Sequence, residues 1–109
     1  MNATKFIKRI YESISIGTVI RKPKKDSVVL DIKENGNIYY RIGVSNKKFV
    51  TKNELSQTYE ILRKGHLSNA HLYEIVTSSK PCNATTIKWL LEHSGLAKET
   101  ADGTFAKRW

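Results

Sequence analysis

Residues 27–44, SVVLDIKENGNIYYRIGV, carry the strongest fold signal in the chain. The runs 27–33 and 38–44 are rich in β-branched and aromatic residues, which is typical of β-strands. Between them lies Asn35-Gly36, the dipeptide favoured in two-residue type I′ turns because both of its residues tolerate positive φ. The stretch therefore predicts an antiparallel β-hairpin.

Further strands are predicted on both sides of this hairpin, at residues 18–20 and 48–51. Residues 21–26, RKPKKD, are predicted to form a longer connection before the hairpin. Residues 45–47, SNK, are predicted to form a tight turn after it. The first half of the chain is therefore predicted to contain a three- or four-stranded antiparallel meander.

The adjacent tyrosines Tyr39 and Tyr40 must point to opposite faces of this sheet, because side chains alternate along a strand. One of them therefore points away from the core and lies among lysine and arginine side chains. Such a tyrosine could stack on an unpaired base. The alternative interpretation is that it packs against the first helix.

Helices are predicted where apolar residues recur with a period near 3.6. They cover residues 3–15, 52–64, 68–76 and 83–94. Thr51 and Glu54 form a capping-box pattern at the start of the second helix, and Ser68 is the expected cap of the third. Pro81 is assigned to the loop before the fourth helix.

The last segment, residues 96–108, has a turn signal at Asp102-Gly103 and is predicted to be a terminal hairpin. We therefore expect an α+β fold in one domain, residues 1–109. Residues 1–51 supply an N-terminal helix and the antiparallel β-meander. Residues 52–109 supply a three-helix group closed by a C-terminal β-hairpin.

The net charge of +9, from 19 Lys and Arg against 10 Asp and Glu, points to an anionic partner. Residues 1–50 hold eleven basic and four acidic residues, a net charge of +7, whereas residues 51–109 hold eight and six, a net charge of +2. The first half is therefore expected to build most of a phosphate-binding surface. The candidate cations there are Arg21, Lys22, Lys24, Lys25, Arg41, Lys47 and Lys48.

The predicted order of the second half, three helices followed by a hairpin, resembles the winged-helix arrangement of DNA-binding proteins. The resemblance rests on residues 83–96, NATTIKWLLEHSGL, followed by Asp102-Gly103 and Lys107-Arg108. It implies that the third helix of the group enters the major groove and that the hairpin lies along the phosphates. The implied groove-facing residues are Asn83, Thr85, Thr86 and Lys88, with Trp89 beside them. The implied phosphate contacts are Lys98, Lys107 and Arg108.

No catalytic, metal or cofactor site is predicted. The six glycines are scattered and form no phosphate loop, and the three histidines and single cysteine lack the spacing of a zinc site. No apolar run approaches the roughly 18 residues of a membrane span, and no secretory signal is found. Cys82 alone gives no disulfide framework. We therefore expect a cytoplasmic protein without enzymatic activity, membrane association or a small-molecule substrate.

Nucleic acid is the predicted partner, and DNA is favoured over RNA. Trp89 and Trp109 are candidate anchors for a protein partner, and the small size suits a homodimer or a larger complex. The alternative function is that of a small phage or mobile-element protein, which would inhibit or adapt a nuclease or CRISPR-type complex by protein–protein contact.

Overall fold

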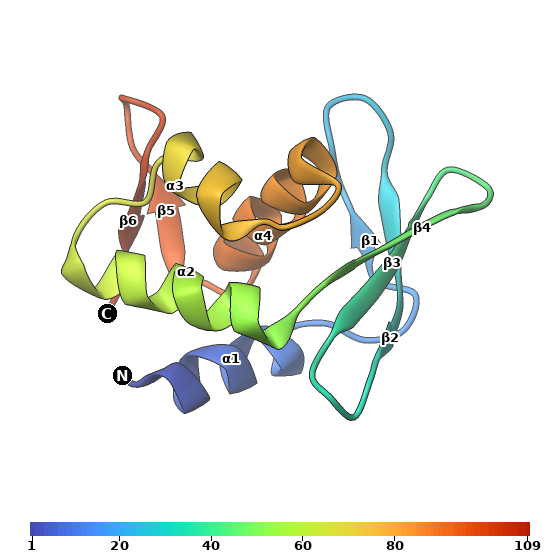
Figure 1. Ribbon diagram of the computed structural model, residues 1–109, viewed down its shortest axis with the longest axis horizontal. Helices are drawn as coiled ribbons and strands as arrows, with labels where there is room; N and C mark the ends of the chain where they lie inside the picture. The colour runs from blue at the N-terminus through green and yellow to red at the C-terminus, as the bar shows by residue number, and fades with distance from the viewer.

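A computed structural model describes all 109 residues of the protein (Figure 1). Its four helices, four-stranded antiparallel sheet and two-stranded hairpin confirm the α+β fold class and the predicted order of elements. The first part of the chain forms α1 Ala3–Glu12, β1 Val19–Ile20, β2 Ser27–Ile32, β3 Ile38–Ile42 and β4 Asn46–Val50. The second part forms α2 Lys52–Lys64, α3 Asn69–Ile75, α4 Lys80–His93, β5 Ala97–Glu99 and β6 Phe105–Lys107. None of the helices combines the length and the apolar character needed to cross a membrane.

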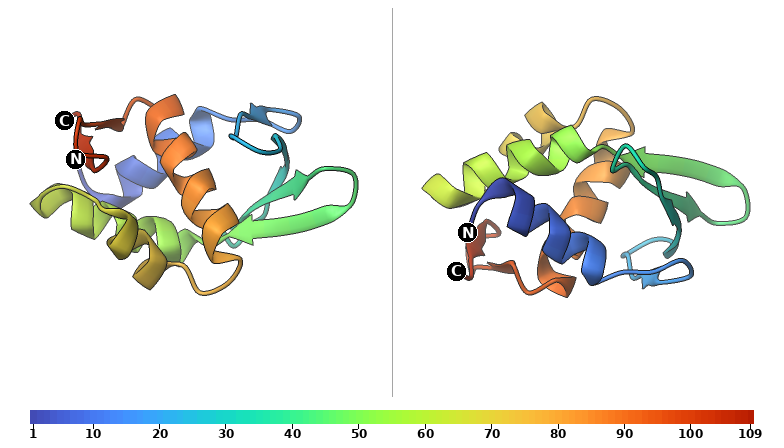
Figure 2. Two further views of the ribbon diagram at one scale, coloured as in Figure 1. Left: turned by 90° about the horizontal axis from the view of Figure 1, so that it is seen from above. Right: turned by 90° about the horizontal axis from the view of Figure 1, so that it is seen from below.

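The sheet has the strand order β1-β2-β3-β4 and turns one face toward the helices (Figure 1). On β3, Ile38 and Tyr40 are fully buried, whereas Tyr39 and Arg41 are half-exposed. The predicted alternation is therefore confirmed, and Tyr40 is the inward tyrosine. No helix covers the face that carries Tyr39 (Figures 1 and 2).

One hydrophobic core connects the two parts of the chain. Its 23 buried residues include side chains from α1, the inner face of the sheet, α2, α3, α4 and the hairpin. Phe6, Tyr40, Leu55 and Leu90, which come from four different elements, have no exposed surface. The helical group therefore cannot move away from the sheet without exposing apolar surface on both.

The turn between β2 and β3 differs from the predicted type I′ turn. The backbone N–H of Lys33 donates to Asn37 (2.9 Å), and that of Gly36 donates to Lys33 (2.9 Å), so the loop has three residues. Gly36 has φ of +90°, whereas Asn35 has a negative φ. This geometry matches a type I turn followed by a left-handed glycine, in which only one residue needs positive φ.

Several predicted boundaries are also wrong. The first helix ends at Glu12 and not at residue 15. The turn between β3 and β4 comprises residues 43–45, not 45–47, because Gly43 (φ +62°) reverses the chain earlier. The fourth helix begins at Lys80, three residues before the predicted start. Pro81 lies in its first turn, where a helix tolerates proline because the missing N–H has no intrahelical partner there.

The predicted starts of α2 and α3 are confirmed. Thr51 accepts a hydrogen bond from the backbone N–H of Glu54 (3.1 Å), and the Glu54 carboxylate accepts one from the backbone of Thr51 (2.7 Å). Ser68 caps α3 in the same way with His71, whose ring nitrogen accepts from the Ser68 backbone (3.0 Å). Both helices therefore begin at fixed residues, with their first N–H groups satisfied.

The predicted terminal hairpin is confirmed as β5 paired with β6. Leu67, in the connection between α2 and α3, exchanges two backbone hydrogen bonds with Phe105 of β6 (2.9 and 2.8 Å). The hairpin is therefore attached to the helical group by backbone bonds as well as by the buried side chain of Phe105.

Gly36→Ala is expected to destabilise the protein more than Gly43→Ala. Both glycines have positive φ, but an added Cβ at Gly36 meets the Tyr11 hydroxyl at 2.5 Å, whereas at Gly43 it meets nothing within 4 Å. Tyr11 donates to the Gly36 carbonyl (2.7 Å), so the clash also loosens the contact of the turn with α1. We expect a loss of about 1–2 kcal/mol at Gly43 and more at Gly36. Urea unfolding of both variants measures this, and equal losses would contradict it.

Candidate nucleic-acid interface

The connection between β1 and β2, residues 21–26, is a basic loop closed by its one acidic residue. Asp26 accepts a hydrogen bond from the backbone N–H of Lys22 (3.1 Å) and pairs with the Arg21 guanidinium (2.7 Å). These two interactions lower the pKa of the Asp26 carboxyl. Lys24 and Lys25 are exposed and have no carboxylate partner. The loop therefore presents two free ammonium groups on a backbone held by Asp26.

The same loop packs against the start of α4. The ammonium of Lys22 lies 3.5 Å from the carbonyl oxygen of Cys82 and 4.5 Å from the centre of the Tyr40 ring. Burial lowers the pKa of Lys22 to about 8, and nearby Cys82 opposes this effect. The hollow between the loop and the helix has a volume of about 270 Å³. Its lining residues are Lys22, Pro23, Lys24, Ile42, Pro81, Cys82 and Thr85.

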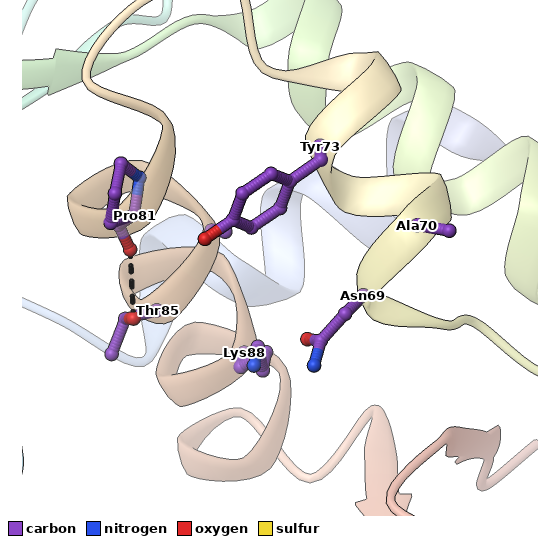
Figure 3. A pocket seen from close by; sticks show the side chains of 7 residues that line it. Asn69, Ala70, Tyr73, Pro81, Thr85 and Lys88 are labelled. Carbon is purple, nitrogen blue, oxygen red and sulfur yellow. Dashed lines mark hydrogen bonds between the residues drawn. The ribbon is translucent and has the colours of Figure 1, made fainter.

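A second hollow, of about 330 Å³, lies on the other side of α4, between this helix and α3 (Figure 3). Its lining residues are Asn69, Ala70, Tyr73, Pro81, Ala84, Thr85 and Lys88. Tyr73 reaches from α3 toward α4, and Asn69 points into the gap on the side of Lys88 (Figure 3). Pro81 and Thr85 border both hollows, and we call the two hollows together the α4 groove.

Seen from above, α4 crosses the middle of one face of the molecule (Figure 2, left). The basic loop lies on one side of it, and the terminal hairpin lies on the other (Figures 1 and 2). The structure therefore brings together Lys22, Lys24, Thr85 and Lys88, which come from both halves of the sequence, and Lys25 follows Lys24 in the exposed loop.

Asn83 and Thr86 do not face outward, so their predicted role as groove-facing residues is wrong. Asn83 is 1% exposed, and Thr86 has no exposed surface. The Asn83 amide donates to the carbonyls of Phe49 (3.0 Å) and Ser78 (2.9 Å) and accepts from the Tyr40 hydroxyl. Its polar atoms are all used inside the protein, and the Thr86 hydroxyl donates to the Cys82 carbonyl (2.9 Å).

Lys47 and Lys48, two of the predicted phosphate-binding cations, both lie within β4 and not in a loop. By register, Lys47 is opposite Arg41, and Lys48 is opposite the inward Tyr40. Adjacent residues of a strand point to opposite faces, so these lysines cannot bind one phosphate together. Arg41 and Lys47 belong to the uncovered face of the sheet, away from α4.

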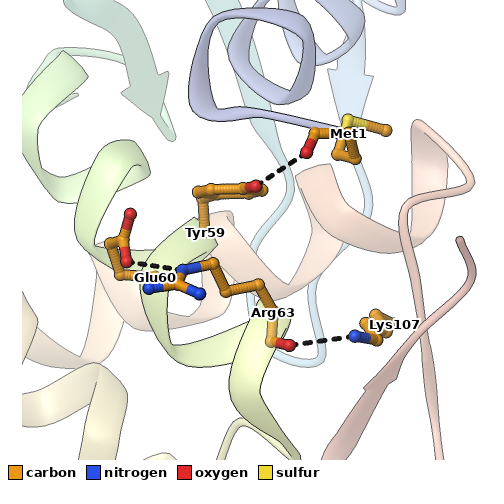
Figure 4. Close-up of polar contacts among 5 residues, drawn as sticks. All are labelled: Met1, Tyr59, Glu60, Arg63 and Lys107. Carbon is orange, nitrogen blue, oxygen red and sulfur yellow. Dashed lines mark hydrogen bonds and ion pairs between the residues drawn. The ribbon is translucent and has the colours of Figure 1, made fainter.

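Lys98 lies in β5, Lys107 lies in β6 and Arg108 directly follows β6. The tip of the hairpin, in contrast, carries the acidic residue Asp102. The Lys107 ammonium donates to the Arg63 carbonyl at the end of α2 (2.9 Å; Figure 4). Lys98 and Arg108 are exposed. At the tip, hydrogen bonds from Thr100 and Thr104 hold the pKa of the Asp102 carboxyl well below its usual range. The structure therefore does not place a cation at the tip of the hairpin.

Both tryptophans predicted as interface anchors are half-buried in this chain. Trp109 packs edge-on against Phe6, with ring centres 5.7 Å apart, and stacks on Tyr59 at 6.0 Å. Trp89 stacks on His93 with ring centres 4.2 Å apart. Trp109 is therefore largely used in closing the core, and Trp89 remains partly accessible on α4.

Sequence reasoning missed Asn69 and Tyr73, which line the α4 groove from α3. Tyr73 is 44% exposed, and it lies off the buried Leu72 and Ile75 stripe. An aromatic residue off the apolar stripe of a short helix is the signal that could have identified Tyr73.

Comparison with known protein families, curated proteins and solved structures gave no significant match.

Asn83→Ala is expected to lower the free energy of unfolding by roughly 2–4 kcal/mol. It leaves the buried Tyr40 hydroxyl without its partner and removes two partly buried hydrogen bonds, to the carbonyls of Phe49 and Ser78. Thr85→Ala, two residues along the same helix and half-exposed, is the matched control and should cost about 1 kcal/mol or less. Chemical unfolding monitored by tryptophan fluorescence checks both. Similar small losses would show that Asn83 is not a structural residue.

Lys22→Met is expected to remove a pH-dependent contribution to stability. The pKa of Lys22 is about 8 in the folded protein and 10.5 in the unfolded chain, so unfolding takes up a proton between these values. The contribution of Lys22 to the free energy of unfolding therefore increases as the pH rises through this window. Unfolding measured below pH 8 and at several pH values between 8 and 10.5 should show the wild type gaining stability relative to Lys22→Met across that window. A constant difference would contradict this.

Proposed function

We propose that this protein binds nucleic acid, with duplex DNA as the first candidate, through the α4 groove and the basic loop beside it. One observation carries the proposal: unpaired lysines of the loop lie next to an accessible helix side that offers polar side chains. The function proposed is binding in the cytoplasm, and no chemistry is assigned to these residues.

The roles follow from the position of each group. Lys24 and Lys25 are exposed point charges at the edge of the surface, which suits contact with phosphates. Lys88, Thr85 and Asn69 line the groove itself, and such side chains hydrogen-bond to base edges as well as to phosphates. Phosphate contacts would thus orient the duplex, and the helix would contact the bases.

The resemblance to the winged-helix arrangement supports the same docking mode, because in those proteins the third helix enters the major groove. The basic loop differs from that pattern, since it comes from the meander and approaches α4 from the side opposite the hairpin (Figure 2). We therefore assign the main phosphate grip to this loop and a secondary one to Lys98 and Arg108. The acidic tip of the hairpin is given no contact.

The double variant Lys24→Glu/Lys25→Glu is expected to weaken duplex binding at least tenfold at about 50 mM salt. The plot of log affinity against log salt should also become shallower, by about 0.9 for each phosphate that the variant no longer neutralises. Fluorescence anisotropy with a labelled duplex, from about 50 to 300 mM salt, measures both quantities.

Lys5→Glu/Lys8→Glu is the matched control, because it changes the net charge equally at two exposed residues of α1, a helix that contributes no residue to the α4 groove. It should keep the wild-type salt slope. Equal effects of the two double variants would mean that only total charge matters. If the wild type binds no duplex at low salt, the proposal fails, and a protein partner becomes the explanation of the charge.

A further inference from the structure

The sheet has a second accessible surface, on the side away from the helices (Figures 1 and 2). On β4, Phe49 is 38% exposed, whereas its neighbour Val50 is fully buried. Val19 on β1 is likewise 40% exposed next to a buried Ile20. We call this surface the open sheet face. Its residues are Val19, Val28, Asp31, Tyr39, Arg41, Lys47 and Phe49.

An aromatic pair lies in this face. Tyr39 and Phe49 are directly opposite each other on β3 and β4. Their rings are stacked, with centres 5.0 Å apart and planes inclined by 24°. The solvent side of an antiparallel sheet is usually polar, so an exposed aromatic pair there is a deviation from the ordinary pattern. Because the cross-strand contact fixes both rings, a flat partner can stack on them with little loss of side-chain freedom.

Two cations lie in the next row of the same face. Arg41 and Lys47 are directly opposite each other, an arrangement of like charges that destabilises a sheet by itself. Neither is in an ion pair, and the Arg41 guanidinium donates only to the nearby Gly43 carbonyl (3.1 Å). An anion bound between them would relieve this repulsion. The rows are separated by two residues along each strand, a distance of about 7 Å.

A third cation is associated with the aromatic pair. The Lys33 ammonium lies 5.6 Å from the centre of the Tyr39 ring, and it is paired with Asp31 at 3.1 Å. Asp31, the carboxylate on this edge of the sheet opposite Tyr39, is thereby neutralised. The net positive charge of the open sheet face therefore comes from Arg41 and Lys47, in the row next to the aromatic pair.

We propose that the open sheet face binds single-stranded nucleic acid, with unpaired bases stacked on Tyr39 and Phe49 and the backbone held by Arg41 and Lys47. Stacked aromatic rings flanked by cations are what a strand of alternating flat bases and anionic phosphates requires. A duplex does not fit, because its bases are already stacked inside. This surface is separate from the α4 groove, so the proposal does not depend on duplex binding.

The test uses the full chain and two labelled probes of about 12 nucleotides, an oligothymidylate and an abasic strand with the same backbone. The wild type is expected to bind the oligothymidylate at least tenfold more tightly than the abasic strand. Tyr39→Leu/Phe49→Leu keeps apolar side chains but removes the rings, so it should lower oligothymidylate affinity about 5- to 100-fold and leave abasic binding unchanged. Phe49→Tyr, which keeps the ring, should retain wild-type affinity.

Thermal unfolding shows whether the leucine variant is folded. If it is not, NMR of the wild type decides, because bases stacked on Tyr39 and Phe49 shift the ring proton resonances of these two residues. The proposal is overturned if the wild type binds both probes equally or binds neither at about 50 mM salt. It is also overturned if Lys24→Glu/Lys25→Glu abolishes single-strand binding while the folded leucine variant keeps it, since the strand would then lie on the α4 groove. Equal displacement of the oligothymidylate by polyglutamate would likewise show recognition of charge alone.

Discussion

The hydrogen bonds of one buried amide position the helical group relative to the sheet. Asn83 lies in the first part of α4, donates to the backbone of β4 at Phe49 and to the connection at Ser78, and accepts from Tyr40 on β3. The bond to Tyr40 is buried and the other two are partly buried, and all three would be lost if α4 moved or rotated. Apolar packing tolerates small displacements, whereas this set of bonds fixes one arrangement. The α4 groove exists because α4 is held at this position beside the 21–26 loop.

A buried carboxylate has a similar function in the connection between α3 and α4, at the end next to α3. Glu54 caps α2 through Thr51, and its second oxygen accepts a hydrogen bond from the backbone N–H of Thr77 (3.1 Å). The segment between α3 and α4 is thus held by Glu54 at one point and by Asn83 at another. Two polar side chains, each satisfied by backbone groups, therefore determine how α3 and α4 diverge, and with it the width of the groove that Tyr73 and Lys88 line.

Local signals predict most of the fold. The alternation along β3, the Thr51–Glu54 capping box and the cap at Ser68 depend on near neighbours in sequence, so they can be recognised without the structure. The loop assignment of Pro81 is wrong because proline suits both a loop and the first turn of a helix, and only the contacts of α4 distinguish the two.

The site is less predictable, because its residues are brought together by contacts between distant segments. Composition identifies the lysines of the basic loop, but their contact with Cys82, some 60 residues away, has no local pattern. Asn83 and Thr86 lie off the apolar stripe of α4, so the pattern predicts that they face solvent, whereas the sheet buries that side of the helix as well. Charge alone groups Arg41 with the lysines of the basic loop, although the Arg41 side chain lies on the face of the sheet that points away from α4.

The packing of Trp109 on Phe6 has a consequence for how the protein folds. These two rings are separated by nearly the whole sequence, yet each covers the other, and Tyr59 closes the same cluster while donating to the backbone of Met1 (2.9 Å; Figure 4). Contacts between such distant residues form late, because the chain must first close a very long loop. During synthesis, the part of Phe6 that Trp109 covers therefore stays exposed until Trp109 has left the ribosome and docked, although α2 can pack on α1 earlier.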